Sequence, residues 1–146
     1  MYAQNRRLER REEIVDSLSR DFLVTRRESL TEWEKQGQFL EGTGSMILDR
    51  TNKIVYASIS ERTNEKVLDI FCEKTGYQAV KFTAYQQVGE DRLPIYHTNV
   101  MMALGEDFAI LCTACIDDEV ENDRAQHRQH GRDDHFPDRR LCEHVH

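Results

Sequence analysis

The stretch "SMILDRTNKIVYASIS", residues 45–60, decides the architecture expected of this 146-residue chain. Its apolar residues fall in two short runs, Met46–Leu48 and Ile54–Ala57, which are typical of strands. The polar run "DRTNK" between them has the composition of a turn. The stretch therefore predicts a β-hairpin, and the segments on either side of it determine how the sheet continues.

A helix and another strand are predicted directly after the hairpin. The segment "SERTNEKVLDIFCEKTGY", residues 60–77, offers Ser60 and Thr63 as helix caps, and the helix is expected to stop at Gly76. The apolar stripe of this helix consists of Val67, Leu68, Ile70 and Phe71. The following "QAVKFTAY", residues 78–85, alternates as a strand does. This order predicts small repeated modules, while composition alone leaves α/β and α+β open.

Regions on both sides of this module complete the expected element order. A helix is predicted over about Arg6–Arg20, because apolar residues recur there at helical spacing. Its apolar side would carry Leu8, Ile14, Val15, Leu18 and Phe22. After the module, "QVGEDRLP", residues 87–94, is predicted to be a loop. Two more strands are expected in "IYHTNVMMALG", residues 95–105, and "DFAILCTACI", residues 107–116.

The charge and hydropathy of the chain exclude several classes of function. The formal net charge is −7, whereas a general nucleic-acid binder presents a basic face. No apolar run approaches the roughly 20 residues that span a bilayer, and the N-terminus lacks the apolar core of a signal peptide. We therefore expect a cytoplasmic protein with neither a nucleic-acid nor a membrane partner. Its cysteines, which are Cys72, Cys112, Cys115 and Cys142, are expected to be free thiols.

Apolar residues become sparse after Ile116, and Arg and His are concentrated in "ENDRAQHRQHGRDDHFPDRRLCEHVH", residues 121–146. The core must therefore come from residues 1–116, which we expect to form one domain. Residues 117–146 show no helical or strand period. We predict that they form a polar tail, which is either disordered or the product of a truncated or shifted reading frame.

Glu41, in "FLEGTG", residues 39–44, admits two interpretations. As a structural residue, its carboxylate would accept backbone N–H bonds from Thr43 or Gly44 in a turn. As a functional residue, it would hold a cationic ligand at the end of a strand, where a glycine backbone allows close approach. Arg62 is similarly either a surface residue beside a helix cap or a ligand for a carboxylate.

His97 and Asn99 lie in "IYHTNV", residues 95–100, and in a strand they would share one face with Ile95. An imidazole and an amide buried beside apolar residues both need hydrogen-bond partners. His97 is thus either a satisfied structural histidine or a general acid–base residue whose tautomer a neighbour sets.

Cys112 and Cys115, in "CTAC", suggest a zinc site because histidines follow them in the sequence. Zinc-binding pairs of this spacing usually lie on tight turns, whereas the expected strand would point the two thiols to opposite faces. The strand-to-helix context of a redox CxxC is also missing. Two core cysteines are the favoured interpretation, and we expect neither a metal nor a cofactor.

Several segments, taken together and in this order, resemble the amidinotransferase/deiminase superfamily. They are "NRRLERREEIV", "EWEKQGQFLEGTGSMILDR", "SERTNEKVL", "IYHTNVMM" and "FAILC". The similarity extends from about Tyr2 to Ile116 and looks closest to the citrulline-utilising hydrolases, which are also called amidinotransferases. It implies an α/β fold of the pentein type, a five-bladed α/β propeller of ββαβ modules, of which this chain would contain a part.

The resemblance also implies a chemistry and a role for each candidate residue. In this family a cysteine thiolate attacks a guanidinium or ureido carbon, and a histidine moves protons to the leaving nitrogen and from water. Glu41 matches a carboxylate that binds the substrate, and His97 matches the catalytic histidine. Arg62 matches an arginine that binds the substrate's α-carboxylate. Asn99 would be a further substrate-binding residue, at a position where other branches carry an aspartate.

The chain departs from the family pattern at the nucleophile. The family's cysteine lies in a glycine-rich motif like "GGGS.RC", which this sequence lacks. The resemblance also implies that the N-terminal and C-terminal blades of the family fold are missing from this chain. We therefore predict a hydrolase of citrulline or an arginine derivative that is inactive as this fragment. One alternative is a non-catalytic propeller fragment that self-associates through open blade edges. The other is a metal-binding protein built from "CTAC" and the His-rich tail.

Overall fold

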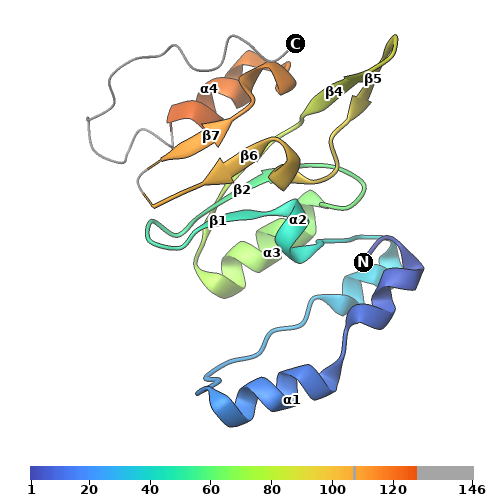
Figure 1. Ribbon diagram of the computed structural model, residues 1–146, viewed down its shortest axis with the longest axis vertical. Helices are drawn as coiled ribbons and strands as arrows, with labels where there is room; N and C mark the ends of the chain where they lie inside the picture. Colours follow the sequence, from blue (N-terminus) through green and yellow to red (C-terminus); the bar gives the residue numbers. More distant parts are fainter. Residues whose placement is uncertain (107, 128–146) are drawn as a thin grey trace.

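The computed structural model describes residues 1–106 and 108–127, and its centre is a three-stranded sheet (Figure 1). The strands β1 (Ile47–Asp49), β2 (Ile54–Ser58) and β3 (Gln78–Phe82) lie in the order β1-β2-β3. β1 is antiparallel to β2, as the predicted hairpin requires, whereas β3 is parallel to β2. A parallel pair needs a crossover connection, and the helix α3 (Glu65–Thr75) supplies it. The predicted hairpin, helix and strand are confirmed, and the mixture of helices and strands is α/β.

The ends of α3 follow ordinary capping chemistry. The side chain of Asn64 accepts a hydrogen bond from the Val67 N–H at 3.3 Å, so Asn64 is the N-cap. Gly76 ends the helix in the left-handed conformation, with φ 74°. The predicted caps are wrong, because Ser60 and Thr63 instead pair with each other through two backbone hydrogen bonds in the preceding turn.

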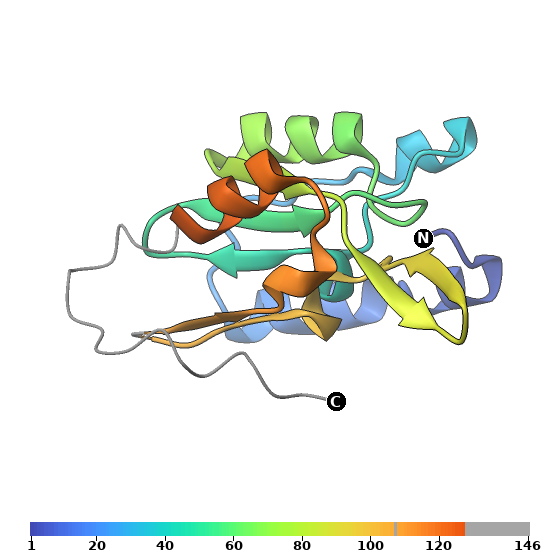
Figure 2. The same ribbon diagram turned by 90° about the horizontal axis from the view of Figure 1, so that it is seen from above.

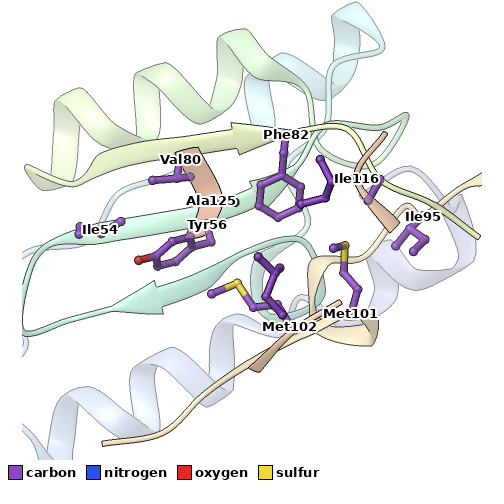
Figure 3. Packing of buried hydrophobic residues seen from close by; sticks show 11 residues of the cluster. Ile54, Tyr56, Val80, Phe82, Ile95, Met101, Met102, Ile116 and Ala125 are labelled. Atoms are coloured by element: carbon purple, nitrogen blue, oxygen red, sulfur yellow. The ribbon is translucent and has the colours of Figure 1, made fainter. Parts of the chain in front are cut away.

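The two faces of the sheet are covered by different elements (Figure 2). Val55 and Ala57 of β2 pack against Leu68 on the α3 side. Ile54 and Tyr56 point to the opposite face, because successive strand residues alternate. That face holds the larger cluster, which Figure 3 shows from close by: Ile54, Tyr56, Val80, Phe82, Ala84, Ile95, Met101, Met102, Leu111, Ile116 and Ala125. β2 is buried along its whole length because both faces are covered.

Two hairpins follow the central sheet. β4 (Tyr85–Val88) and β5 (Asp91–Pro94) pair antiparallel where a loop was predicted from residue 87. All four residues of β5 are exposed, so this hairpin has no apolar face to produce an alternating pattern. β6 (Met102–Leu104) and β7 (Ala109–Leu111) form the second hairpin, which confirms two strands in this region but makes them shorter than expected. The 3-10 turn η3 (Thr98–Val100) precedes β6, and the 3-10 turn η4 (Thr113–Cys115) follows β7.

The N-terminal segment does not form the single predicted helix. The predicted range is divided into η1 (Gln4–Glu9) and α1 (Glu12–Asp21), and η2 (Thr31–Gln36) follows as a separate 3-10 helix. Arg10 and Arg11 are extended between η1 and α1, which breaks the helix. The predicted apolar stripe is also not buried: Leu8, Ile14, Leu18 and Phe22 are exposed. The helical spacing of these residues therefore marks a real amphipathic face that nothing within the described chain covers.

The last described element is α4 (Glu119–His127), where a polar tail without secondary structure was predicted. Asp118 accepts a hydrogen bond from the Glu121 N–H at 2.9 Å and so begins the helix. Ala125 is fully buried in the larger cluster, which attaches α4 to the sheet. Residues 128–146 of the predicted tail lie outside the described residues, and the division into two domains stays a prediction.

No helix among residues 1–106 and 108–127 is long and apolar enough to cross a membrane. The cytoplasmic location expected from the sequence remains a prediction.

One buried hydroxyl joins three segments that are distant in the sequence. Thr98 Oγ1 donates to the Ser45 carbonyl at 2.6 Å and accepts from the Ser58 N–H at 2.9 Å. Ser45 ends the short helix α2 (Gly42–Ser45), and Ser58 ends β2. All three residues are 0% exposed, so water cannot replace either bond. We call these two hydrogen bonds the Thr98 bridge, and they fix η3 against the sheet and against α2.

We predict that Thr98→Val lowers the free energy of unfolding by about 2–4 kcal/mol, because a buried N–H and a buried carbonyl lose their partner. Thr98→Ser keeps the hydroxyl and loses a methyl group, so it should cost about 1 kcal/mol. Urea unfolding of the two variants measures the difference. Equal losses of stability would show that the Thr98 bridge contributes nothing beyond packing.

Candidate active site

A buried Glu41 and a half-buried His97 form a hydrogen-bonded pair beside the Thr98 bridge. Glu41 Oε2 lies 3.1 Å from His97 Nε2, across 56 residues of sequence. The Glu41 side chain is 6% exposed and that of His97 is 18% exposed. The other Glu41 oxygen, Oε1, accepts the Tyr2 N–H at 2.9 Å. Both residues admitted a structural and a functional interpretation from the sequence, and the structure places them in contact.

The backbone on both sides of Glu41 holds its carboxylate toward His97. The Glu41 N–H donates to the Arg62 carbonyl at 3.1 Å, and the Glu41 carbonyl accepts the Ser45 N–H at 3.1 Å. Glu41 stands at the N-cap position of α2, yet its side chain makes no capping hydrogen bond. The interpretation of Glu41 as a residue that accepts backbone N–H bonds from Thr43 or Gly44 is therefore wrong.

The Arg62 guanidinium also lies close to the Glu41 carboxylate. Its Nη1 is 3.8 Å from Glu41 Oε2, a longer separation than the contact with His97. The Arg62 guanidinium lies 4.2 Å from the centre of the Tyr96 ring and 5.8 Å from that of Tyr2, which are cation–π geometries. Arg62 Nε is buried without a hydrogen-bond partner. Arg62 is thus held in place by a carboxylate and two rings while retaining an unused donor.

Gly44 leaves room for the His97 ring. A Cβ atom at Gly44 would lie 3.0 Å from Cγ and 3.1 Å from Nδ1 of His97. A Cβ atom at Gly42 would meet nothing within 4 Å. The sequence suggested that these glycines let the backbone approach a substrate. For Gly44, the nearest group is instead the imidazole, so this glycine sets the position of the ring.

The charges of the pair follow from its surroundings. Burial alone would raise the pKa of Glu41, but the hydrogen bonds from His97 and Tyr2 and the charge of Arg62 outweigh it. The pKa therefore lies below its ordinary value of 4.5, and the carboxylate is ionised at neutral pH. This stabilising contribution is present above pH 4.5 and is lost as the pH falls through the lowered pKa.

An ionised carboxylate only accepts hydrogen bonds, so His97 Nε2 must carry the proton that it shares with Glu41. Nδ1 is then the acceptor in the neutral imidazole. Among the side chains that the structure describes, which do not include that of Thr43, none forms a hydrogen bond with Nδ1. This arrangement leaves Nδ1 as the imidazole nitrogen that can exchange a proton with a reacting group.

The structure places Asn99 apart from this cluster. It was expected to share a strand face with His97, but the chain turns into η3 directly after His97. The Val100 N–H bonds back to the His97 carbonyl at 3.3 Å, and this turn leaves Asn99 exposed. Tyr2, Tyr96 and Thr98 also belong to the surroundings of the site, although no sequence pattern indicated them. Tyr96 and Thr98 flank His97 directly, but a strand in this segment would place only Ile95 and Asn99 on the same face as His97.

A cavity of about 350 Å³ opens on another side of Glu41. It lies between the N-terminal segment, η2 and α3, and its walls include Glu34, Leu40, Glu41, Met46, Phe71 and Lys74. Neither His97 nor Arg62 lines it. Glu41 therefore both lines this cavity and contacts His97.

The described cysteines lie elsewhere. Cys72 packs in the layer between α3 and the sheet, where burial raises its pKa. Cys112 directly precedes the turn η4 and Cys115 is its last residue. The predicted continuous strand through "CTAC" is therefore wrong. Cys142 lies outside the described residues. No group of three or more His, Cys, Asp or Glu residues within 1–106 and 108–127 could hold a metal ion.

We predict that Gly44→Ala displaces the His97 ring, because the added methyl would lie 3.0 Å from it. The ring-proton chemical shifts of His97 should change in Gly44→Ala and should keep their wild-type values in Gly42→Ala. Gly42→Ala is the matched control, since it makes the same change in the same helix where space is open. Unchanged His97 shifts in Gly44→Ala would contradict this role for Gly44.

The chain matches a known protein family. The family model of eukaryotic N,N-dimethylarginine dimethylhydrolases matches residues 1–135. No curated protein and no solved structure matches the chain. The matched range contains Glu41, Arg62 and His97, together with every element that positions them. The family is one of hydrolases that act on the guanidino group of methylated arginine, which agrees with the resemblance to guanidino-modifying enzymes. Since the match covers far more than half of its length, this chain belongs to the eukaryotic N,N-dimethylarginine dimethylhydrolase family.

Proposed function

We propose that Glu41, His97 and Arg62 form the substrate-binding and proton-transfer part of a hydrolase that converts methylated arginine to citrulline. The observation that carries this proposal is the 3.1 Å contact between a buried, ionised Glu41 and His97. A carboxylate that keeps its charge away from water is suited to a planar cation such as a guanidinium. Citrulline itself, through its ureido group, is the second substrate to be tested.

Each residue has a distinct role in this proposal. The two Glu41 oxygens offer about four acceptor directions, of which Tyr2 and His97 take one each, so directions remain for the guanidinium N–H groups. His97 Nδ1 would carry the proton to the leaving amine and would then accept a proton from the attacking water. Arg62 would bind the α-carboxylate of the substrate through its guanidinium group. Asn99 remains a proposed substrate-binding residue only if substrate approaches from its exposed side.

The nucleophile of this reaction is not assigned. In the described parts of the chain, neither Cys72 of α3 nor Cys112 or Cys115 at η4 forms a hydrogen bond with His97. We propose that the unit β1–β2–α3–β3 is one ββαβ module of an α/β propeller, in which further modules would carry the thiolate. We therefore expect this 146-residue chain to bind substrate without turning it over.

The test is to titrate N,N-dimethylarginine into the purified chain by calorimetry and to assay the same samples for citrulline and dimethylamine. We expect binding without product. Glu41→Gln should weaken binding by about 10- to 100-fold, because it removes a charge-assisted contact worth about 1.5–3 kcal/mol. Glu61→Gln removes the same charge from an exposed neighbouring position and should bind as the wild type does.

Two results would contradict the proposal. If Glu41→Gln binds N,N-dimethylarginine as tightly as the wild type, Glu41 does not recognise the substrate. If the wild type does not bind it at all, Glu41, His97 and Arg62 do not form a substrate-binding site. Release of citrulline that disappears in His97→Ala would mean that a cysteine of this chain is the nucleophile. Running citrulline in parallel, with ornithine and ammonia as products, distinguishes the two substrate classes.

Self-association is a second proposal, supported by surfaces left open in the described chain. The apolar face of α1 is uncovered, and Ile110 on the outer hairpin strand β7 is 57% exposed. Unpaired strand edges and apolar faces of this kind favour association with another copy. Sedimentation velocity should show dimers or larger species that Ile110→Lys reduces. A single monomeric species at every concentration would refute this proposal.

A further inference from the structure

The turn η4 brings the two sulfurs of "CTAC" together. The Cys115 N–H donates to the Cys112 carbonyl at 3.2 Å, which closes a 3-10 turn. Side chains three residues apart eclipse each other in this geometry, whereas in a strand they would point to opposite faces. The Sγ atoms of Cys112 and Cys115 consequently lie 2.8 Å apart.

Three other segments hold this turn in place. The Cys112 N–H donates to the Met101 carbonyl at 2.9 Å, directly after η3. Asn122 of α4 donates to the Thr113 carbonyl at 3.0 Å, and Arg92 of β5 donates to the Ala114 carbonyl at 3.2 Å. Because the backbone is fixed from three sides, the sulfurs meet without any rearrangement of the chain.

The two thiols differ in their surroundings. Cys112 is exposed, while Cys115 is half-buried against the larger core cluster. Burial, and then the contact with the Cys112 sulfur, raise the pKa of Cys115 to about 12. Cys115 is therefore a protonated thiol that donates to Cys112, and Cys112 is the sulfur that a reagent in solution reaches first.

We propose that Cys112 and Cys115 form a reversible dithiol–disulfide pair that exchanges with a low-molecular-weight disulfide, with Cys112 reacting first. The Cys112 thiolate attacks one sulfur of that disulfide, so a mixed disulfide forms and one small thiolate leaves. Cys115 then loses its proton to solvent and attacks the Cys112 sulfur. This second step forms the internal disulfide and releases the second small thiol. The two protein thiols are oxidised, and the small disulfide is reduced to two thiols.

Oxidised glutathione is the probe for this proposal. The 146-residue chain is incubated with it, quenched with acid, alkylated and mapped by mass spectrometry. We expect the wild type to lose two hydrogens in a bond that joins Cys112 to Cys115, and dithiothreitol should restore both thiols. Cys72→Ser and Cys142→Ser are the controls, and each should form the same bond as the wild type.

Two matched variants test the order of the steps. Cys115→Ser should stop at glutathione attached to Cys112, since the resolving thiol is missing. Cys112→Ser should react with glutathione at least about tenfold more slowly, because its remaining thiol is half-buried and protonated. The proposal is wrong if the wild type accumulates a lasting glutathione adduct, pairs either cysteine with Cys142, or leaves both thiols unreacted.

Discussion

The hydroxyl of Thr98 is the contact on which the geometry of the site depends. It joins the end of α2, the end of β2 and the start of η3 inside a region that excludes water. Glu41 stands directly before α2, and His97 stands directly before η3. The hydroxyl therefore fixes the two ends of the Glu41–His97 contact relative to each other, although 56 residues separate them in the sequence.

The site follows from this bridge and from the sheet that supports it. The buried strand β2 gives the bridge a rigid base, and the parallel pairing of β3 with β2 requires the α3 crossover that covers the other face. Gly44 leaves room for the His97 ring above α2. The ionised Glu41 then sets the tautomer of His97 and lies opposite the Arg62 guanidinium. The position of the carboxylate–imidazole pair thus depends on the end of β2, on Gly44 and on the buried hydroxyl of Thr98.

The sequence predicted the central module well because its signals are local. The apolar runs around residues 45–60 and Gly76 identify the hairpin, the helix and the helix end from neighbouring residues alone. The sequence predictions failed where burial does not follow the local pattern. Every residue of β5 is exposed, so its sequence predicts a loop. Ile14 and Leu18 of α1 remain exposed although their spacing predicted a buried stripe. Glu41 and His97 could be named as candidates, but their contact is a long-range one that no local pattern contains. The turn after His97 also buries Thr98 and exposes Asn99, whereas a strand would have placed Asn99 on the same face as His97.

The most direct test of this account is the affinity of N,N-dimethylarginine for Thr98→Ser and Thr98→Val, measured by calorimetry where circular dichroism shows both variants folded. If the Thr98 bridge sets the distance between Glu41 and His97, Thr98→Ser should bind within about twofold of the wild type. Thr98→Val should bind at least about tenfold more weakly, which corresponds to about 1.4 kcal/mol. Wild-type affinity in a folded Thr98→Val would contradict the account, because the carboxylate–imidazole pair would then form without the hydroxyl.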